Sequence, residues 1–135
     1  MLQVGYVLEG RFKILKEIGR GGMSVVYMAH DMNAGNICAV KEIRRGGNVG
    51  EEVSEQRLVA EVGILKKLYH PSLPKVIDVI EYADSIIMVM EYIEGRNLEN
   101  LIKHTGAQDP VEAIRWGSQL CDVLQYLHTR IPIIV

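Results

Sequence analysis

A glycine-rich turn that leads directly into a strand-forming sequence is the feature that most constrains the fold of this chain. Residues 11–18 have a β-strand pattern, and the sequence Gly-Arg-Gly-Gly-Met-Ser-Val-Val-Tyr follows at 19–27. In a dinucleotide-binding turn the glycines open a helix, whose N-terminus holds the pyrophosphate. Here β-branched and aromatic residues follow the glycines, and these residues favour a strand. The glycines are therefore predicted at the tip of a β-hairpin, as a flap that can lie over a triphosphate.

Composition excludes several classes of protein. The 135 residues are 48% hydrophobic and 24% charged, which is typical of one soluble globular domain. A net charge of −2 gives no support to nucleic-acid binding, and the scattered histidines predict no metal site. Cys38 and Cys121 lie in apolar runs, so both are predicted to be buried, reduced thiols. Neither a secretion signal nor a membrane-spanning run is evident, and we expect a cytoplasmic protein.

The order of the predicted elements indicates an α+β fold. A helix is predicted over residues 51–69, ended by His70-Pro71, and it separates the third strand from the fourth. This order predicts a five-stranded antiparallel sheet with one helix packed on one face. The last strand is apolar on both faces, so we expect it to be central and covered on both sides. The predicted strands are 12–18, 25–30, 37–43, 76–82 and 85–91.

The pattern becomes helical after Gly95. Asn97 is a candidate N-cap for a short helix that runs through Lys103. Asp109-Pro110 combines an N-cap with a first-turn proline, and it predicts a helix to about His128. The chain is thus predicted to divide into a β-rich lobe at 1–93 and the start of a helical lobe at 94–135.

Lys41 and Glu61 are the candidate charged pair. The period of two in the third strand places Lys41 on one face with Ile37, Ala39 and Ile43, where an amine is costly unless it is paired or faces a polar ligand. Glu61 lies on the apolar stripe of the predicted helix over 51–69, which must face the sheet. Each residue supplies the charge that the other lacks, so we expect an ion pair. The alternatives are that Lys41 extends its amine to water and that Glu61 reaches solvent at the edge of the stripe.

These motifs, in this order, resemble the N-terminal part of a protein kinase domain, especially the eukaryotic-type serine/threonine kinases of bacteria. The resemblance runs from about Leu8 to the end of the chain. The glycine run alone would be weak evidence, but the order and spacing together are specific. The matching sequences are Gly19-x-Gly21-x-x-Ser24-x-Val26, Ala39-Val40-Lys41, Glu61 nine residues before His70-Pro71, and Met88-Val89-Met90-Glu91-Tyr92.

The resemblance implies ATP as the ligand and a role for each matching residue. Gly19, Gly21 and Gly22 would bring their backbone amides to the phosphates, and Lys41, paired with Glu61, would contact the α- and β-phosphates. The remaining matches would hold the nucleoside: Val26 and Ala39 enclose the adenine, Met90 lies at the back of its pocket, Glu91 and Ile93 bind it through the main chain, and Asn97 contacts the ribose.

Two departures from the family pattern affect the expected activity. Ser24 replaces the third glycine, and we expect nucleotide binding to survive that change. The catalytic-loop motif H-R-D and the metal-binding motif D-F-G occur nowhere in the 135 residues, so the ligands for Mg²⁺ are absent from them. We therefore expect this polypeptide to be inactive as a phosphotransferase by itself, whereas the parent kinase would phosphorylate a protein substrate.

An exposed apolar stripe on the helix at 110–128 is expected to drive self-association. A non-catalytic, pseudokinase-like module that binds nucleotide or a partner is the alternative function. A dinucleotide-binding oxidoreductase is excluded, because a strand rather than a helix follows the glycines. The stripe consists of Ala113, Ile114, Gly117, Leu120, Cys121, Leu124 and Leu127.

Overall fold

Two compact units make up the protein in a computed structural model that describes residues 1–44 and 66–130. The first unit comprises Met1–Leu68 and Pro74–Ile93, and the second comprises Tyr69–Leu73 and Glu94–Val135. The second unit therefore includes a short segment, Tyr69–Leu73, that the sequence division at 93/94 assigned to the first.

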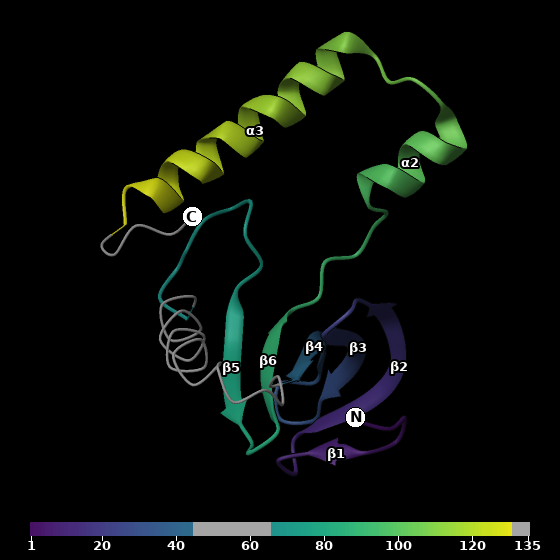
Figure 1. The fold of residues 1–135 in the computed structure, drawn as a ribbon, viewed down its shortest axis with the longest axis vertical. Coiled ribbons are helices and arrows are strands. Elements are labelled where there is room, and N and C mark those ends of the chain that lie inside the picture. The colour runs from purple at the N-terminus through teal and green to yellow at the C-terminus, as the bar shows by residue number, and fades with distance from the viewer. Residues whose placement is uncertain (45–65, 131–135) are drawn as a thin grey trace. The chain divides into compact units, whose positions relative to one another are not determined.

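The first unit is built on an antiparallel sheet (Figure 1). The strand order is β1-β2-β3-β4-β6-β5, and every neighbouring pair is antiparallel. The predicted α+β class is confirmed. The predicted count of five strands is wrong, because the two residues of β1 are too few to show an alternating pattern. The strands are β1 (Val7–Leu8), β2 (Phe12–Arg20), β3 (Ser24–Asp31), β4 (Asn36–Arg44), β5 (Val76–Glu81) and β6 (Ser85–Glu91).

β6 is an interior strand that is buried on both faces. It lies between β4 and β5, and four consecutive residues from Ile86 to Val89 are at most 8% exposed. A continuous apolar run of this kind is typical of a strand covered on both sides. The prediction that the last strand is central is confirmed.

The two faces of the sheet carry different side chains. On the first, here called the core face, β3 contributes Val25, Tyr27 and Ala29, each at most 5% exposed, while its intervening residues from Ser24 to His30 are only partly buried. This alternation follows from the period of two in a strand. The core-face cluster consists of Leu8, Phe12, Ile14, Val25, Tyr27, Ala29, Cys38, Val40, Ile87 and Val89.

The opposite face is called the lysine face, because Lys41 belongs to it. Lys41 pairs across the ladder with Met88, and Met88 packs with Ile86 in a second buried cluster. Partly buried Val76, Val79 and Met90 pack against that cluster. The predicted helix over 51–69 lies mostly outside the described residues. Its predicted end is wrong, since residues 66–67 form a turn and residues 68–69 belong to no helix or strand.

Helices α2 (Leu98–Thr105) and α3 (Pro110–His128) form the second unit together with Tyr69–Leu73. Asn97 caps α2 by accepting a hydrogen bond from the Asn100 N–H at 2.7 Å, and Asp109 caps α3 by accepting from the Val111 N–H at 2.7 Å. Both predicted N-caps are confirmed. Satisfied amides at the first turn explain why each helix begins where it does.

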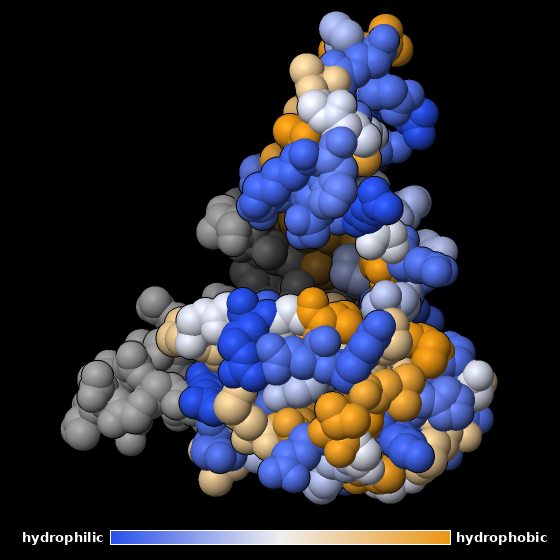
Figure 2. Space-filling view, turned by 90° about the vertical axis from the view of Figure 1, so that its right-hand side faces the viewer, coloured by the Kyte–Doolittle hydropathy of each residue, from blue (hydrophilic) through white to orange (hydrophobic). Residues whose placement is uncertain are grey.

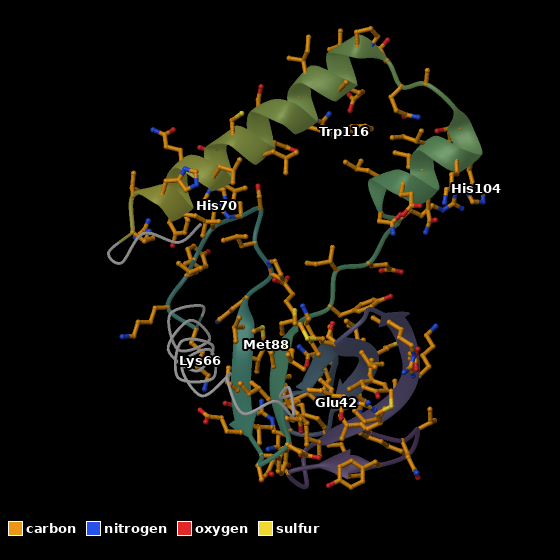
Figure 3. The ribbon with its side chains drawn as sticks, in the orientation of Figure 1. Glu42, Lys66, His70, Met88, His104 and Trp116 are labelled. Atoms are coloured by element: carbon orange, nitrogen blue, oxygen red, sulfur yellow. The ribbon has the colours of Figure 1, made fainter. Side chains whose placement is uncertain are left out.

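Tyr69–Leu73 is anchored on α3 by polar contacts. The Tyr69 N–H donates to the Tyr126 hydroxyl at 2.8 Å, and the His70 ring lies 5.0 Å from the Tyr126 ring. His70 Nδ1 accepts the Ser72 N–H at 3.1 Å, so Nε2 carries the ring proton and donates to Asp122 at 3.1 Å. Figure 3 shows His70 beside the C-terminal half of α3.

Much of the apolar stripe on α3 is exposed. Ile114 is 69%, Leu120 56% and Leu124 48% exposed, and hydrophobic side chains stand among hydrophilic ones on the side of the helices seen in Figure 2. Cys121 is also exposed, so the prediction that both cysteines are buried is wrong for it. Cys38 is buried as predicted, and this burial raises the pKa of its thiol to about 11. None of the helices in the described ranges is long and apolar enough to cross a membrane.

Candidate functional site

The strand register brings Lys41 together with the glycine-rich turn and its following strand. Lys41 on β4 lies opposite Val26 on β3, and Val26 in turn lies opposite Gly19 on β2. On the other side of β4, Lys41 lies opposite Met88. Directly paired residues in an antiparallel ladder point to the same face. Gly19, Val26, Lys41 and Met88 therefore form one row across the lysine face.

A second row lies beside the first. Ala39 is opposite Met28 on β3 and opposite Met90 on β6. Ala39 is 7% exposed, while Met28 and Met90 are partly buried. The predicted residues Ala39 and Met90 are therefore direct cross-strand neighbours on the lysine face.

Lys41 is surrounded by apolar neighbours on this face. Val26 and Met88 flank it across the ladder, and Ala39 and Ile43 flank it along β4. Its side chain is partly buried. An amine in such a setting is stabilised by a carboxylate or by an anionic ligand. The predicted partner Glu61 lies outside the described residues.

The glycine-rich segment forms the predicted hairpin turn. β2 ends at Arg20 and β3 begins at Ser24, and the Gly21 N–H donates to the Ser24 carbonyl oxygen at 2.8 Å. The Arg44 N–H donates to the Met23 carbonyl oxygen at 3.0 Å, which ties the turn to the end of β4. The turn is thus held at its base by main-chain hydrogen bonds.

The protein itself does not require glycine at the tip of this turn. Gly19, Gly21 and Gly22 all have φ values outside the left-handed region that favours glycine. Within residues 1–44 and 66–130, a Cβ added at Gly22 would meet no atom within 4 Å, and one at Gly21 would lie 3.6 Å from Ser24 Oγ. The missing side chains therefore leave open space beside the backbone, and that space can admit a ligand closely.

The remaining predicted site residues follow β6. The Glu91 N–H donates to the Lys75 carbonyl oxygen at 2.9 Å, and a Glu91 carboxylate oxygen accepts the Lys75 N–H at 3.3 Å. Ile93 is 63% exposed at the end of the first unit. Asn97 belongs to the second unit, where its side-chain oxygen is used to cap α2.

Sequence reasoning missed Glu42, the neighbour of Lys41 on the core face. Its side chain is 6% exposed, and its carboxylate is held by three donors, the Leu2 N–H at 3.0 Å, the Tyr27 hydroxyl at 3.1 Å and the Met1 amino group at 3.2 Å. Burial opposes ionisation of Glu42, but these donors outweigh it, and the pKa lies below its ordinary value. The signal was present, because the alternation that directs Lys41 to one face directs Glu42 to the other.

The chain is similar to known proteins over most of its length. Residues 12–134 match the family model described as "Protein kinase domain". The chain is 28% identical over 129 residues to a probable serine/threonine-protein kinase PknB of Lactococcus lactis, which covers 96% of this chain and 21% of that protein. It is 32% identical over 125 residues to the serine/threonine-protein kinase PrkC of Bacillus subtilis, covering 93% of this chain and 19% of PrkC.

A solved structure shows the same fold. The crystal structure of Rad53 1-466 in complex with AMP-PNP superposes with a TM-score of 0.76 at 25% identity, covering 88% of this chain and 30% of that one. The chain spans between 15% and 51% of the length of the first curated relatives that it matches. With the match to the family model over nearly its whole length, the chain belongs to the protein kinase domain family.

Proposed function

We propose that this chain is the ATP-binding part of a serine/threonine protein kinase, whose complete domain transfers the γ-phosphate of ATP to protein hydroxyls. The observation that supports the proposal is the row Gly19–Val26–Lys41 across the lysine face, which gives an amine and a glycine-rich turn on one surface. An amine binds phosphate as a point charge, and a glycine-rich turn lets backbone amides approach it.

Each predicted residue takes its proposed role from the family resemblance. Lys41 contacts the α- and β-phosphates and pairs with Glu61, while the amides of Gly19, Gly21, Gly22 and Ser24 line the phosphates. The nucleoside contacts are proposed for Val26 and Ala39 at the adenine, Met90 behind it, the main chain of Glu91 and Ile93 at its edge, and Asn97 at the ribose.

The residues on the lysine face fit such a ligand. Val26, Ala39 and Met90 are apolar and suit the flat faces of a base, as in most ligand pockets, where apolar walls surround a few polar groups. Lys41 supplies the positive charge that a triphosphate requires, and the open space at Gly21 and Gly22 admits its oxygens. The bound nucleotide would supply the phosphoryl group, and these residues bind and orient it.

We further propose that these 135 residues do not catalyse phosphoryl transfer by themselves. Neither H-R-D nor D-F-G occurs in the sequence, so no catalytic aspartate orients a substrate hydroxyl and no family ligand holds Mg²⁺. The alternative function is a pseudokinase-like module that binds nucleotide or a partner without catalysis. A radiolabelled-phosphate transfer assay with turnover near that of a normal kinase would refute the proposed inactivity.

Substitution of Lys41 tests nucleotide binding. We expect Lys41→Met to weaken ATP binding, measured by calorimetric titration, by about 10- to 100-fold, because a hydrogen bond to a charged group contributes about 1.5–3 kcal/mol. Lys13→Met is the matched control, since Lys13 is an exposed lysine of β2 in the row of His30 and Ile37, away from the glycine-rich turn. Equal ATP affinity in the wild type and Lys41→Met would contradict the proposal, provided that both are folded.

Two further features of the protein are proposed. The exposed stripe on α3 drives self-association of this chain in solution, because exposed apolar side chains such as Ile114 and Leu120 favour burial against a second copy. Light scattering that shows a monodisperse monomer at high concentration would count against self-association.

The protein is also proposed to act in the cytoplasm, where ATP is available.

A further inference from the structure

A buried carboxylate on the core face lies directly behind the proposed phosphate-binding lysine. Glu42 follows Lys41 on β4, and its side chain enters the core face opposite Val25 of β3 and Ile87 of β6. Figure 3 labels Glu42 within the first unit. A buried carboxylate is costly unless hydrogen bonds satisfy it. The buried carboxylate of Glu42 is therefore expected to bind hydrogen-bond donors and to hold the segment that carries them.

The segment that Glu42 holds is the N-terminal strap, residues 1–8. Glu42 Oε2 accepts the Leu2 N–H at 3.0 Å, and Oε1 lies 3.2 Å from the Met1 nitrogen. The other end of the strap pairs with β2 through β1, and the Gly5 N–H donates to the Ile14 carbonyl oxygen at 2.8 Å. The strap thus runs from the edge strand β1, paired with β2, to a carboxylate on β4.

The strap ends against the glycine-rich turn. A hollow on this side of the turn is lined by Met1 and Glu42 together with Gly21, Gly22 and Met23. Met1 Sδ also lies 3.8 Å from Arg20 Nη1, and Arg20 is the last residue of β2 before the turn. The contacts of Met1 therefore connect Glu42 to the base of the turn.

We propose that Glu42 is a positioning residue for nucleotide binding, acting through the strap to support the glycine-rich turn from the core side. This inference rests on the proposed function, because it assigns the turn to the phosphates. Glu42 does not touch the nucleotide, since its side chain lies on the face opposite Lys41. Its part is to fix Met1 and Leu2, which limits the positions that the turn can take.

Glu42→Gln removes this support with little change in shape. The three donors on Glu42 need two acceptor oxygens, and glutamine offers one oxygen and an NH₂ group that is itself a donor. At least one contact to the strap or to Tyr27 is therefore lost. Tyr27→Phe is the second variant, because it removes one donor and leaves the contacts from Met1 and Leu2 in place.

Hydrogen exchange of single amides reports on the turn without nucleotide. The Gly21 N–H and the Arg44 N–H, which hold the turn at its base, report on its opening. The Val40 amide, in the middle of β4, reports on opening of the whole sheet. In Glu42→Gln we expect exchange at Gly21 and Arg44 to become several-fold faster, exchange at Val40 to change little, and ATP affinity to fall several-fold.

Glu9→Gln is the matched control. Glu9 also accepts a tyrosine hydroxyl, that of Tyr82 at 2.7 Å, but it does not line the hollow beside the turn. In the Glu9→Gln variant, we expect the amides of Gly21 and Arg44 to exchange at the same rate as in the wild type. Tyr27→Phe is expected to change exchange at the turn less than Glu42→Gln does.

Three outcomes would overturn the inference. Exchange at Gly21, Arg44 and Val40 that rises equally in Glu42→Gln would show a general loss of stability. Unchanged exchange at the turn would show that the strap does not support it, and faster exchange at the turn with unaltered ATP affinity would show that support of the turn is irrelevant to binding. Failure of the wild type to bind ATP is a separate result, and it would refute the proposed function instead.

Discussion

Among the described residues of the first unit, Asp31 and Glu42 are the two buried carboxylates, and each is held by several donors. Asp31 ends β3 and accepts Arg11 Nε at 2.9 Å and Nη2 at 2.6 Å, while its Oδ1 also accepts the N–H groups of Asn33 and Ala34. The Arg11 guanidinium lowers the pKa of Asp31 to about 2, because these hydrogen bonds favour the ionised form. A single side chain thus fixes the start of β2 and the turn between β3 and β4.

The pH dependence of stability tests the contribution of Asp31. Its pKa is lower in the folded protein than its ordinary value of 3.8, so the unfolded chain binds the proton first as the pH falls. The stabilisation is present above about pH 4 and is lost as the pH falls towards 2. We expect the melting temperature of the wild type to fall through this range, and that of Asp31→Asn to start lower and fall less. Asp109→Asn, an equally good helix cap, is the control and should follow the wild type.

At the residue scale, the alternation of a strand was sufficient to assign faces but not partners. It placed Lys41 on one face with Ala39, as the register confirms. It could not show that residues 1 and 2 donate to Glu42, because that contact joins segments 40 residues apart in sequence. Cys121 was assigned to the interior because its neighbours are apolar, and the structure leaves it exposed.

The backbone of the glycine-rich turn does not by itself require glycine, so we attribute its glycines to the proposed contact with phosphates. Gly21 has an ordinary φ and space for a Cβ, whereas Gly35, in the turn between β3 and β4, has a φ of +72°. Alanine is therefore tolerated by the backbone at the first position and strained at the second.

This contrast gives a paired prediction. Gly21→Ala should leave the melting temperature unchanged or slightly raised and weaken ATP binding, because its methyl group occupies space proposed for a phosphate. Gly35→Ala should lower the free energy of unfolding by about 1–2 kcal/mol and leave ATP affinity unchanged. Thermal denaturation and calorimetric titration measure the two effects. ATP affinity equal to that of the wild type in folded Gly21→Ala would show that the turn does not contact the phosphates closely.

Elements with strong local signals were predictable, and those set by distant contacts were not. The caps Asn97 and Asp109 and the apolar run of β6 gave helix starts and a central strand that the structure confirms. The two-residue strand β1 exists through its pairing with β2, and no local pattern indicates it. The apolar spacing continues to Leu68 and so predicts helix over residues 66–69, whereas the structure has a turn at 66–67 and no helix up to 69.

At the scale of the whole molecule, the composition of the two units depends on contacts between distant segments. The sequence predicts only that His70-Pro71 ends a helix, whereas in the structure His70 contacts Asp122 and Tyr126 on α3, more than 50 residues later in the chain. The family could be predicted from the order and spacing of its motifs.

Labelling with a reactive ATP tests the central claim that the lysine face binds the triphosphate of ATP. With an acyl phosphate at the terminal phosphate of ATP, a nearby lysine amine attacks the acyl carbonyl, an amide forms and ATP leaves. Peptide mass spectrometry should find the acyl group chiefly on Lys41, and excess unmodified ATP should suppress it. Two results would contradict this claim. One is labelling of the exposed Lys13 and Lys16 to the same extent as Lys41. The other is labelling of Lys41 that excess unmodified ATP does not reduce.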